Sequence, residues 1–372
     1  MIRKLSQHSP RFQRISAILN EDALPPRYLH FIRQAIYASP NIHTYSQIHL
    51  LPARIRRRLA DAFGSDHILT LEAPSVDTSQ QCIKPLLTLR KDQEQVEAVW
   101  MQFRDSQHTS VCLSSQVGCA LKCAFCATGA AGFKRQLDAD EITDQILFFL
   151  KQQQSLDSRD PLKMAKLPDT ISFMGMGEAL NNPRTFDALH ILTEGMGLSP
   201  RRISVSTVGV VPGIAKLSRT FPQINLAFSL HSPFKDQRNE LVPMNKMYPL
   251  DVVMPVLEEH VLRTKRKVFL AYLVLPEYND SKDHAMAIVD LLDKLDPRTR
   301  PLFHLNLLKY NPAQGVPKEF KQTTKDEVMR FRGYFPQGRV PITVRQSFGV
   351  DIDAACGQLY RIAQKQKAKA TA

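Results

Sequence analysis

Beyond Ser110 the chain alternates between short apolar runs and longer stretches in which apolar residues recur every three or four positions. The runs predict buried β-strands and the longer stretches predict helices between them. Six strands are expected, over 110–116, 170–175, 202–207, 224–230, 267–275 and 303–309. Strand–helix alternation of this kind builds a parallel sheet covered by helices. The pattern therefore predicts an α/β fold, a partial (β/α)6 barrel rather than the closed eight-stranded form.

The clearest helix is expected after Asp138, which can cap it, with Glu141 in capping-box position. Its apolar residues, Ile142, Ile146, Leu147 and Leu150, fall on one helical face. Further helices are expected over 185–195, 212–220, 250–262, 282–295 and 325–335. The stretch 157–169 is polar and contains proline, which predicts an exposed loop.

The chain before the barrel has a different pattern. Its first 85 or so residues predict short helices broken by proline, with an amphipathic stretch over 53–63. From Ile83 the pattern becomes strand-like. We therefore expect four parts: a small helical N-terminal domain (1–85), connecting strands (86–104), the core barrel (105–345) and a C-terminal loop with a basic tail (346–372).

The sequence argues against two classes of protein, those that span a membrane and those that are secreted. The 372 residues are 43% hydrophobic, as in proteins with a sizeable core. The most apolar run, Val268 to Leu275, is much shorter than a membrane-spanning helix requires. No apolar stretch follows the basic residues at the start, so a secretory signal is not expected either. A cytoplasmic protein is the expectation.

Net charge of +13 favours a polyanionic partner, because each phosphate that is neutralised releases condensed counterions. Basic residues gather at two places, Arg54, Arg56, Arg57 and Arg58 and then Lys365, Lys367 and Lys369 in the tail. A basic enzyme without a nucleic-acid substrate would carry the same charge. Charge alone leaves both interpretations open.

Three of the six cysteines lie within eight residues, spaced Cys119-x3-Cys123-x2-Cys126, just after the first expected barrel strand. Three thiolates can hold a cubane iron–sulfur cluster by three irons and leave the fourth iron open for S-adenosylmethionine (SAM). Ferredoxins instead close the cluster with four cysteines. The alternatives are chance clustering or a structural zinc, which needs a fourth ligand that is not found nearby. The spacing predicts a 4Fe-4S cluster.

The surrounding sequence is more specific than the cysteines. CLSSQVGCALKCAFCATGAAGFKRQL, FMGMGEAL, VSTVGVVPGI, SLHSP and DIDAACGQL occur in that order between Glu97 and Tyr360. This part of the chain resembles the Cfr/RlmN family of radical SAM 23S rRNA adenine methyltransferases. The resemblance implies a radical SAM barrel, one 4Fe-4S cluster, SAM as cofactor and an N-terminal domain that engages RNA.

Polar and glycine residues recur at the carboxyl ends of the expected strands, where β/α barrels carry their chemistry. Taken singly they would be strand caps, turns or core residues. The resemblance assigns SAM contacts to them, and Phe125 would pack on the adenine. The expected SAM-binding residues are Phe125, Gly177, Glu178, Ser206, Ser229, Leu230, His231 and Asn311.

Three further residues acquire roles from the resemblance alone. Cys356 would carry a methyl group, Cys112 would release the product through a transient disulfide, and Glu97 would accept a ring proton. By themselves, Cys356 would be a small buried hydrophobe, Cys112 a core residue and Glu97 an edge-strand glutamate. Cys82 matches no motif and is expected to be structural.

The chemistry that the resemblance implies uses two SAM molecules. One methylates the Cys356 thiolate; the other is reductively cleaved, and the radical so formed activates methyl-Cys356 for addition to adenine. The partners would be 23S rRNA, with tRNA as a second substrate in one branch, and an electron donor such as flavodoxin. Alanine after Glu178, where the C2-methylating branch commonly has proline, favours the C8-methylating branch, which protects ribosomes from antibiotics.

Two other functions stay open at this point. One is an RNA-binding protein that holds structural zinc on the cysteine loop, and metal analysis would distinguish it. The other is a radical SAM enzyme with a non-RNA substrate, for which Cys356 would be dispensable.

Overall fold

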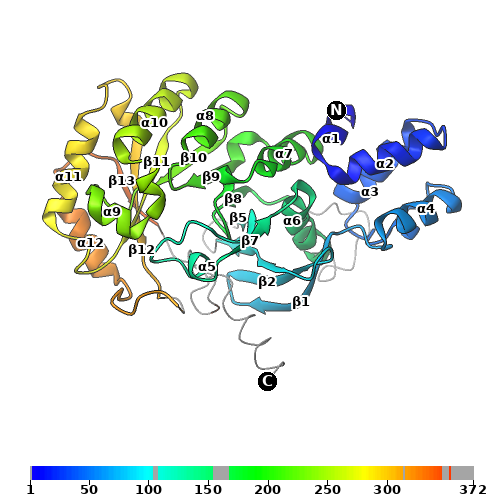
Figure 1. Ribbon diagram of the computed structural model, residues 1–372, viewed down its shortest axis with the longest axis horizontal. Helices are drawn as coiled ribbons and strands as arrows, with labels where there is room; N and C mark the ends of the chain where they lie inside the picture. Colours follow the sequence, from blue (N-terminus) through cyan, green and yellow to red (C-terminus); the bar gives the residue numbers. More distant parts are fainter. Residues whose placement is uncertain (1, 104–107, 154–166, 313–314, 346–351, 353–372) are drawn as a thin grey trace.

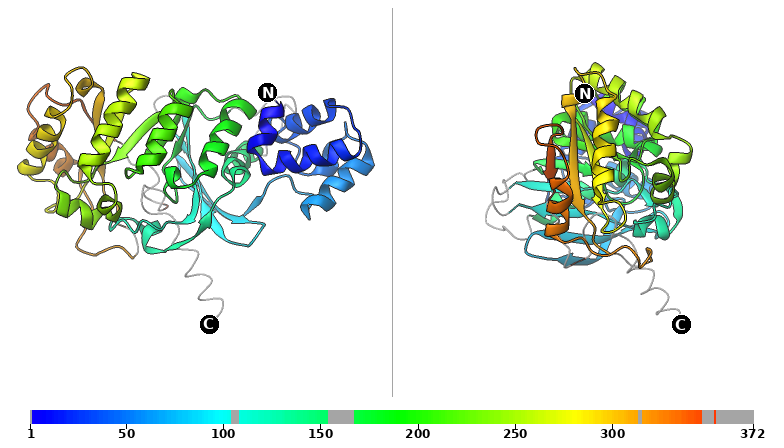
Figure 2. Two further views of the ribbon diagram at one scale, coloured as in Figure 1. Left: turned by 45° about the horizontal axis from the view of Figure 1, so that its top comes forward. Right: turned by 90° about the vertical axis from the view of Figure 1, so that its left-hand side faces the viewer.

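The computed structural model describes residues 2–103, 108–153, 167–312, 315–345 and 352. Helices near the N-terminus lie at one end of the elongated molecule, α11 and α12 lie at the other, and a large sheet runs between them (Figures 1 and 2). All six strands expected after Ser110 are present and run parallel to one another. β13 adds a seventh parallel strand beside β12. The parallel strands are β5 (Thr109–Cys112), β8 (Thr170–Phe173), β9 (Ile203–Thr207), β10 (Asn225–Ser229), β11 (Val268–Val274), β12 (Phe303–Lys309) and β13 (Ile342–Val344).

The parallel strands follow each other in the order β5-β8-β9-β10-β11-β12-β13. β13 therefore stands five places from β8 in the sheet. Even so, Arg345, just after β13, donates a hydrogen bond from Nη1 to the Met174 Sδ, just after β8, at 3.1 Å. The sheet is therefore curled enough for these two strand ends to face each other across its mouth. This curvature confirms the expected partial barrel.

The expected helices are also present. They are α6 (Ala139–Gln153), α7 (Arg184–His190), α8 (Val211–Thr220), α10 (Leu250–Thr264), α11 (Lys282–Asp293) and α12 (Lys325–Gly333). The structure adds a short helix that was not expected, α9 (Lys235–Leu241). The capping interaction expected at α6 is formed, since the Asp138 N–H donates to the Glu141 Oε2 at 2.9 Å. Ile142 and Ile146 are fully buried, as the apolar face of that helix predicted.

The N-terminal region contains α1 (Ile2–His8), α2 (Pro10–Glu21), α3 (Arg27–Tyr37) and α4 (Ala53–Phe63). Antiparallel strands then lead into the barrel: β1 (Leu71–Thr78), β2 (Cys82–Leu89), β3 (Gln95–Glu97) and β4 (Val99–Gln102). Strands thus begin at Leu71, earlier than the change of pattern at Ile83. Most of β1 is exposed, so its sequence shows no alternation of apolar and polar residues that would have predicted a strand.

A buried polar contact joins the N-terminal helices to the barrel. At the start of α2, Ser9 donates its hydroxyl to the Asp140 Oδ1 at 2.6 Å, and the Arg11 N–H donates to the Asp140 Oδ2 at 2.8 Å. The Arg11 guanidinium pairs with Asp144, one turn further along α6. Arg11 and Asp144 are both almost fully buried. A buried ion pair of this kind fixes the orientation of two elements, and removing one partner leaves the other charge uncompensated.

Arg11→Met is expected to lower the free energy of unfolding by about 3–5 kcal/mol, because Asp140 and Asp144 would then be buried without a counter-charge. Urea denaturation followed by circular dichroism measures this loss. Arg14→Met, on an exposed position of the same helix, is the matched control and should cost well under 1 kcal/mol. Equal stability of the two variants would contradict the proposed contribution of the pair.

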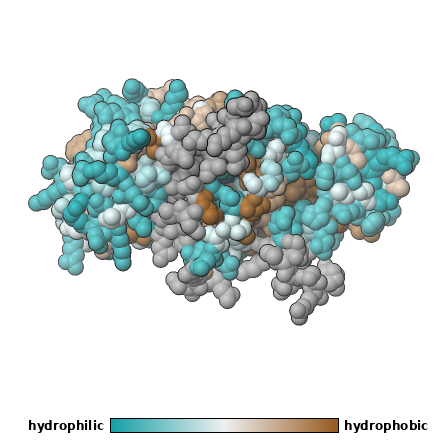
Figure 3. Space-filling model, turned by 90° about the horizontal axis from the view of Figure 1, so that it is seen from below, coloured by the Kyte–Doolittle hydropathy of each residue, from teal (hydrophilic) through white to brown (hydrophobic). Residues whose placement is uncertain are grey.

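Within the described residues, no helix is long and apolar enough to cross a membrane. On the face seen from below in Figure 1, hydrophilic residues cover both ends and apolar residues show near the middle (Figure 3). The most exposed large apolar side chains are Met247 at 67% and Leu50 at 64%. They lie far apart in the sequence, and isolated exposed apolar residues of this kind are common on globular proteins.

Candidate active site at the mouth of the barrel

The three clustered cysteines lie in a tight loop between β6 (Gln116–Gly118) and the short helix α5 (Ala127–Ala130). β6 pairs with β7 (Phe133–Gln136), and the Cys119 N–H donates to the Gly132 O at 2.8 Å. Gly118 has φ of +76°, and a Cβ there would lie 1.9 Å from the Gly132 O. Only glycine permits this approach, so the start of the loop depends on it.

The three thiols are partly buried and lie close enough to influence one another electrostatically. Burial, followed by the nearby Cys126 thiol, raises the pKa of Cys119 to about 12. Burial and the other two thiols raise the pKa of Cys123 well above its usual value. A metal that binds here must therefore displace protons from thiols that are neutral at pH 7.

The donor set fits an iron–sulfur cluster chemically, since it consists of three soft sulfur ligands on one short loop. Among the described residues, no three Cys, His, Asp or Glu side chains lie together closely enough to hold a single metal ion. A cubane cluster requires a different arrangement of ligands, because each of the three protein thiolates binds a separate iron. The loop therefore brings the three thiols together without forming a single-ion site.

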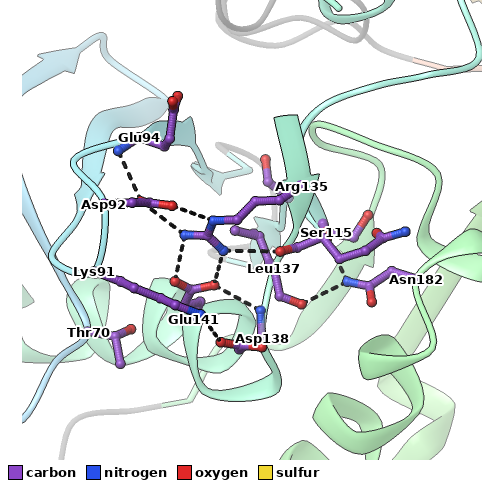
Figure 4. A network of polar contacts seen from close by, with 12 residues as sticks. Thr70, Lys91, Asp92, Glu94, Ser115, Arg135, Leu137, Asp138, Glu141 and Asn182 are labelled. Carbon is purple, nitrogen blue, oxygen red and sulfur yellow. Dashed lines mark hydrogen bonds and ion pairs between the residues drawn. The ribbon is translucent and has the colours of Figure 1, made fainter. Parts of the chain in front are cut away.

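Arg135 of β7 holds this hairpin against the rest of the barrel (Figure 4). Its guanidinium lies between two carboxylates, with Nη1 at 2.7 Å from the Glu141 Oε2 and Nε at 2.5 Å from the Asp92 Oδ2. The remaining guanidinium nitrogen, Nη2, donates to both Asp92 and Glu141, which makes the two ion pairs bidentate. Arg135 lowers the pKa of Asp92 through these hydrogen bonds. The turn after β2, the hairpin and α6 are thus joined by one side chain.

Asn182 adds a second connection in the same region (Figure 4). Its side-chain amide donates to the Ser115 O at 2.8 Å and to the Leu137 O at 2.9 Å. Ser115 immediately precedes β6 and Leu137 immediately follows β7. The amide therefore fixes both ends of the hairpin that carries the cysteine loop.

A cavity of about 170 Å³ opens beside the cysteine loop at the carboxyl ends of the parallel strands. Cys126 and several of the expected SAM-binding residues line it: Phe125, Gly177, Glu178, Ser206, Ser229 and His231. Leu230 and Asn311 are buried but do not contribute to the lining. A larger cavity of about 430 Å³ lies between α10 and α11 and contains none of the expected site residues. The smaller cavity is the candidate cofactor site because the predicted chemistry converges there.

Glu178 lies deep in this cavity wall and is held by backbone N–H groups. Its Oε1 accepts from the Leu180 N–H at 3.2 Å and its Oε2 accepts from the Val208 N–H at 2.9 Å. Burial raises the pKa of Glu178 to about 7, and these hydrogen bonds limit the rise. Two backbone donors leave further lone pairs on the carboxylate, so Glu178 can still accept from a ligand amine.

Gly177 has a conformation that other residues rarely adopt, with φ of +97°. A Cβ at this position would lie 2.5 Å from the Gln116 Cβ. Gln116 in turn accepts the Glu178 N–H on its Oε1 at 2.8 Å. The glycine therefore lets the Gln116 side chain pass close to the backbone that positions Glu178.

Gly177→Ala is expected to weaken SAM binding about tenfold or more, because the new methyl group must displace Gln116 and strain the backbone beside Glu178. Equilibrium binding of SAM to the reconstituted protein measures the change. Gly333→Ala is the matched control, since a Cβ there meets no atom within 4 Å. SAM affinity equal to that of the wild type would show that the Gly177 backbone does not shape the cofactor site.

His231 is held in a fixed orientation. Its backbone has φ of +56°, and its Nδ1 accepts from the Leu273 N–H at 3.0 Å. Burial lowers the pKa of His231 to about 3, so the ring is neutral with its proton on Nε2. The Phe125 ring meets it edge-on, with ring centroids 4.7 Å apart. This pair connects the cysteine loop to the end of β10 across the cavity wall.

Arg238 of α9 was not anticipated from the sequence. Its side chain is fully buried, and its guanidinium donates to the carbonyls of Val208, Ser229 and Leu230, each at 2.9 Å. These carbonyls follow β9 or end β10, the strands that carry Ser206 and Ser229. Arg238 therefore fixes the two strand ends relative to each other. An isolated arginine in a polar segment predicts a surface residue, so no local signal marked it.

Glu97 ends β3 and Cys112 ends β5, and neither lines the cavity. Cys112 of β5 stands opposite Val99 of β4, two residues after Glu97. The Ser114 hydroxyl donates to the Glu97 O at 2.6 Å and accepts the Met176 N–H at 2.9 Å. Ser114 thus connects Glu97 to the loop that carries Gly177 and Glu178.

Glu97 is buried, with 5% of its surface exposed, so it is not a solvated edge-strand glutamate. Lys84 of β2, also buried, places its Nζ 3.8 Å from the Glu97 Oε1. The Asp77 Oδ2 lies 3.7 Å from the same ammonium group. The Lys84 charge compensates a carboxylate that would otherwise be costly to bury. Cys356, the expected methyl carrier, lies outside the described residues.

Known proteins similar to this chain agree with the sequence resemblance. No family model matches the chain. A Shouchella clausii protein named ribosomal RNA large subunit methyltransferase Cfr is 45% identical over 366 residues, covering 98% of this chain and 99% of that protein. Proteins of the same name from Bacillus velezensis and Staphylococcus aureus are 44% and 40% identical, covering 97% and 94% of this chain and 99% and 96% of their own lengths.

Among solved structures, a radical SAM methyltransferase from Sphaerobacter thermophilus superimposes with a TM-score of 0.81 at 34% sequence identity. The match covers 92% of this chain and 95% of that structure. Sequence and structure therefore agree over nearly the whole length of the chain. The chain belongs to the Cfr/RlmN family of radical SAM rRNA methyltransferases, and its similar relatives carry the Cfr name.

Proposed function

We propose that this chain methylates a carbon atom of an adenine in 23S rRNA, in the cytoplasm, with C8 as the preferred position and C2 as the alternative. The Cfr name of relatives that match almost its full length supports the RNA substrate. The observation that carries the proposal is the shared cavity. Phe125 and Cys126 of the cysteine loop line the same space as Glu178 and His231.

Cys119, Cys123 and Cys126 would hold the 4Fe-4S cluster, which supplies the electron for reductive cleavage of SAM. Glu178 would accept hydrogen bonds from the SAM amino group, while the Ser206 and Ser229 hydroxyls would donate hydrogen bonds to SAM. The neutral His231 ring can donate only from Nε2, because Nδ1 is occupied by the Leu273 N–H. Phe125 would cover the adenine of SAM, and its edge contact with His231 supports a fixed ring position.

The remaining proposed roles concern the methyl group and the base. The Cys356 thiolate would take a methyl group from SAM by displacement, since a thiolate is the reactive form of cysteine. The Cys112 thiolate would attack the Cys356 sulfur and form a disulfide. The bond from that sulfur to the product carbon would break, and the carbon would keep the electron pair and take up a proton. Glu97 would accept the ring proton, and the position of Lys84 beside it supports a charged carboxylate there.

Residues 1–85 would form an RNA-binding accessory domain. On α4, Arg54 and Arg57 are exposed and lie one turn apart, so both can reach a phosphate backbone. Arg56 donates to the Ser46 O, and Arg58 pairs with Glu21 and Asp22, so these two stabilise the domain itself. tRNA is a second proposed substrate, and flavodoxin a proposed electron donor.

Anaerobic reconstitution with iron and sulfide, followed by labelled SAM, dithionite or flavodoxin and a 23S rRNA fragment, tests the proposal. Nucleoside mass spectrometry should find methyladenosine, and its retention time distinguishes C8 from C2. Formation of 5′-deoxyadenosine without modified RNA would indicate a non-RNA substrate. Purification with stoichiometric zinc and no bound iron or sulfide would favour a zinc-containing RNA-binding protein.

A further inference from the structure

Arg345 occupies a place at the mouth of the barrel that no expected role explains. Its backbone N–H continues the sheet beyond β13 by donating to the Leu307 O at 2.8 Å. Its side chain crosses from β13 toward β8, donates to the Met174 Sδ at 3.1 Å and lines the same cavity as Glu178. The guanidinium is therefore held in a defined position at the opening.

Among the described residues, no carboxylate balances the charge of Arg345. A thioether is a weak and uncharged acceptor. Within the described part of the chain, the charged residues that line the cavity are Arg345 and Glu178. Glu178 is buried and directed to the N–H groups of Leu180 and Val208. No described carboxylate pairs with Arg345, whereas Arg135 contacts two and Arg330 contacts one.

A guanidinium that meets no described carboxylate at a half-open site favours an anion, and its planar fork suits phosphate oxygens. Met174, Leu308 and Arg345 are partly exposed, whereas Glu178, His231 and Thr207 are buried. Arg345 thus belongs to the rim of the cavity and the buried residues belong to its floor. With SAM in the cavity, a base can approach its opening, and the phosphates on either side of that base must stay at the rim, where they keep part of their hydration.

We propose that Arg345 binds a backbone phosphate of the substrate RNA, adjacent to the adenosine whose base approaches the opening of the cavity. This inference rests on the proposed function, since it needs an RNA substrate. It adds a contact within the barrel itself to the charge of the N-terminal domain. Under the proposed function the SAM carboxylate would be the other anion that could bind Arg345, and the experiment distinguishes the two sources.

The first measurement compares reconstituted wild-type protein with Arg345→Gln, using a 23S rRNA fragment that contains the modified adenosine. Loss of one phosphate contact should weaken RNA binding about tenfold and reduce the slope of log Kd against log salt by about 0.7–0.9. Arg202→Gln is the charge-matched control, because exposed Arg202 precedes β9 at the opposite end of the strands. It should leave the RNA Kd within about twofold of wild type.

The second measurement replaces single phosphates around the target adenosine with neutral methylphosphonates. Wild-type protein should lose affinity at one linkage next to the target, and Arg345→Gln should lose no further affinity at that linkage. Non-additivity of this kind identifies a direct contact. Wild-type protein alone suffices for the scan, so it remains informative if Arg345→Gln fails to fold.

Additive losses, an unchanged salt slope in Arg345→Gln, or a wild-type scan with no sensitive linkage next to the target would overturn the proposal. A weakened SAM Kd with unchanged RNA affinity would assign Arg345 to the SAM carboxylate instead. Methylation of RNA by wild-type protein is measured in the same preparations. If methylation occurs but the contact is absent, only this inference fails. If wild-type protein modifies no RNA, the proposed function itself fails.

Discussion

Cys123→Ala is expected to yield a folded protein that retains no complete 4Fe-4S cluster after reconstitution and forms no 5′-deoxyadenosine. Cys123 lies in the middle of the loop, and its thiol interacts with both other thiols. With two thiolates left, a second iron would be unprotected and the cluster would be lost on desalting. Iron and sulfide analysis with absorption spectroscopy measures the cluster, and chromatography measures 5′-deoxyadenosine. RNA methylation should fall below detection.

Cys82→Ala is the matched control for this variant. Cys82 is also buried, but it lies on β2, away from the cysteine loop. Its replacement removes a small core group and should leave cluster content and 5′-deoxyadenosine formation unchanged, with a stability loss of about 1 kcal/mol. If Cys123→Ala kept a full, active cluster, another ligand would have to replace Cys123 and the assigned ligand set would be wrong.

Cys356→Ala is expected to separate the radical reaction from methyl transfer. The cluster should assemble normally and 5′-deoxyadenosine should still form, because the ligand cysteines are unchanged. RNA methylation should fall by on the order of a thousandfold or more, as expected for loss of a nucleophile. Mass spectrometry of tryptic peptides provides an independent measurement, since only the wild type can carry a methyl group at this position. Methylated RNA from Cys356→Ala at the wild-type rate would exclude its role.

Cys112→Ala tests the release step of the same reaction. Without the attacking thiol, the bond between the Cys356 sulfur and the base-bound carbon should persist, and a covalent protein–RNA adduct should accumulate. Denaturing gel electrophoresis with labelled RNA detects such an adduct. Multiple turnovers at the wild-type rate would show that Cys112 is a core residue without a catalytic role.

Much of the barrel could be predicted from sequence because its strands are buried on both faces. Such strands appear as continuous apolar runs, and amphipathic helices between them show a regular period. The cysteine loop was equally visible, since its ligands are local in sequence. β1 and β13 were missed for the opposite reason. Both lie at the edges of the sheet, β1 is mostly exposed and β13 is only partly buried, so their patterns resemble loops.

The sequence alone determined the alternation of the six central parallel strands with helices, the cysteine loop and, through its motifs, the family. Only the tertiary structure decided which side chains meet at the cavity. The buried Arg238 guanidinium donates to carbonyls at the ends of two strands, and the buried Lys84 pairs with Glu97. Arg345 reaches Met174, which is 171 residues away along the chain. A charged residue has the same local pattern whether it faces water or a distant carbonyl. Periodicity indicates whether a segment is buried, but it does not indicate which distant partner compensates a charge.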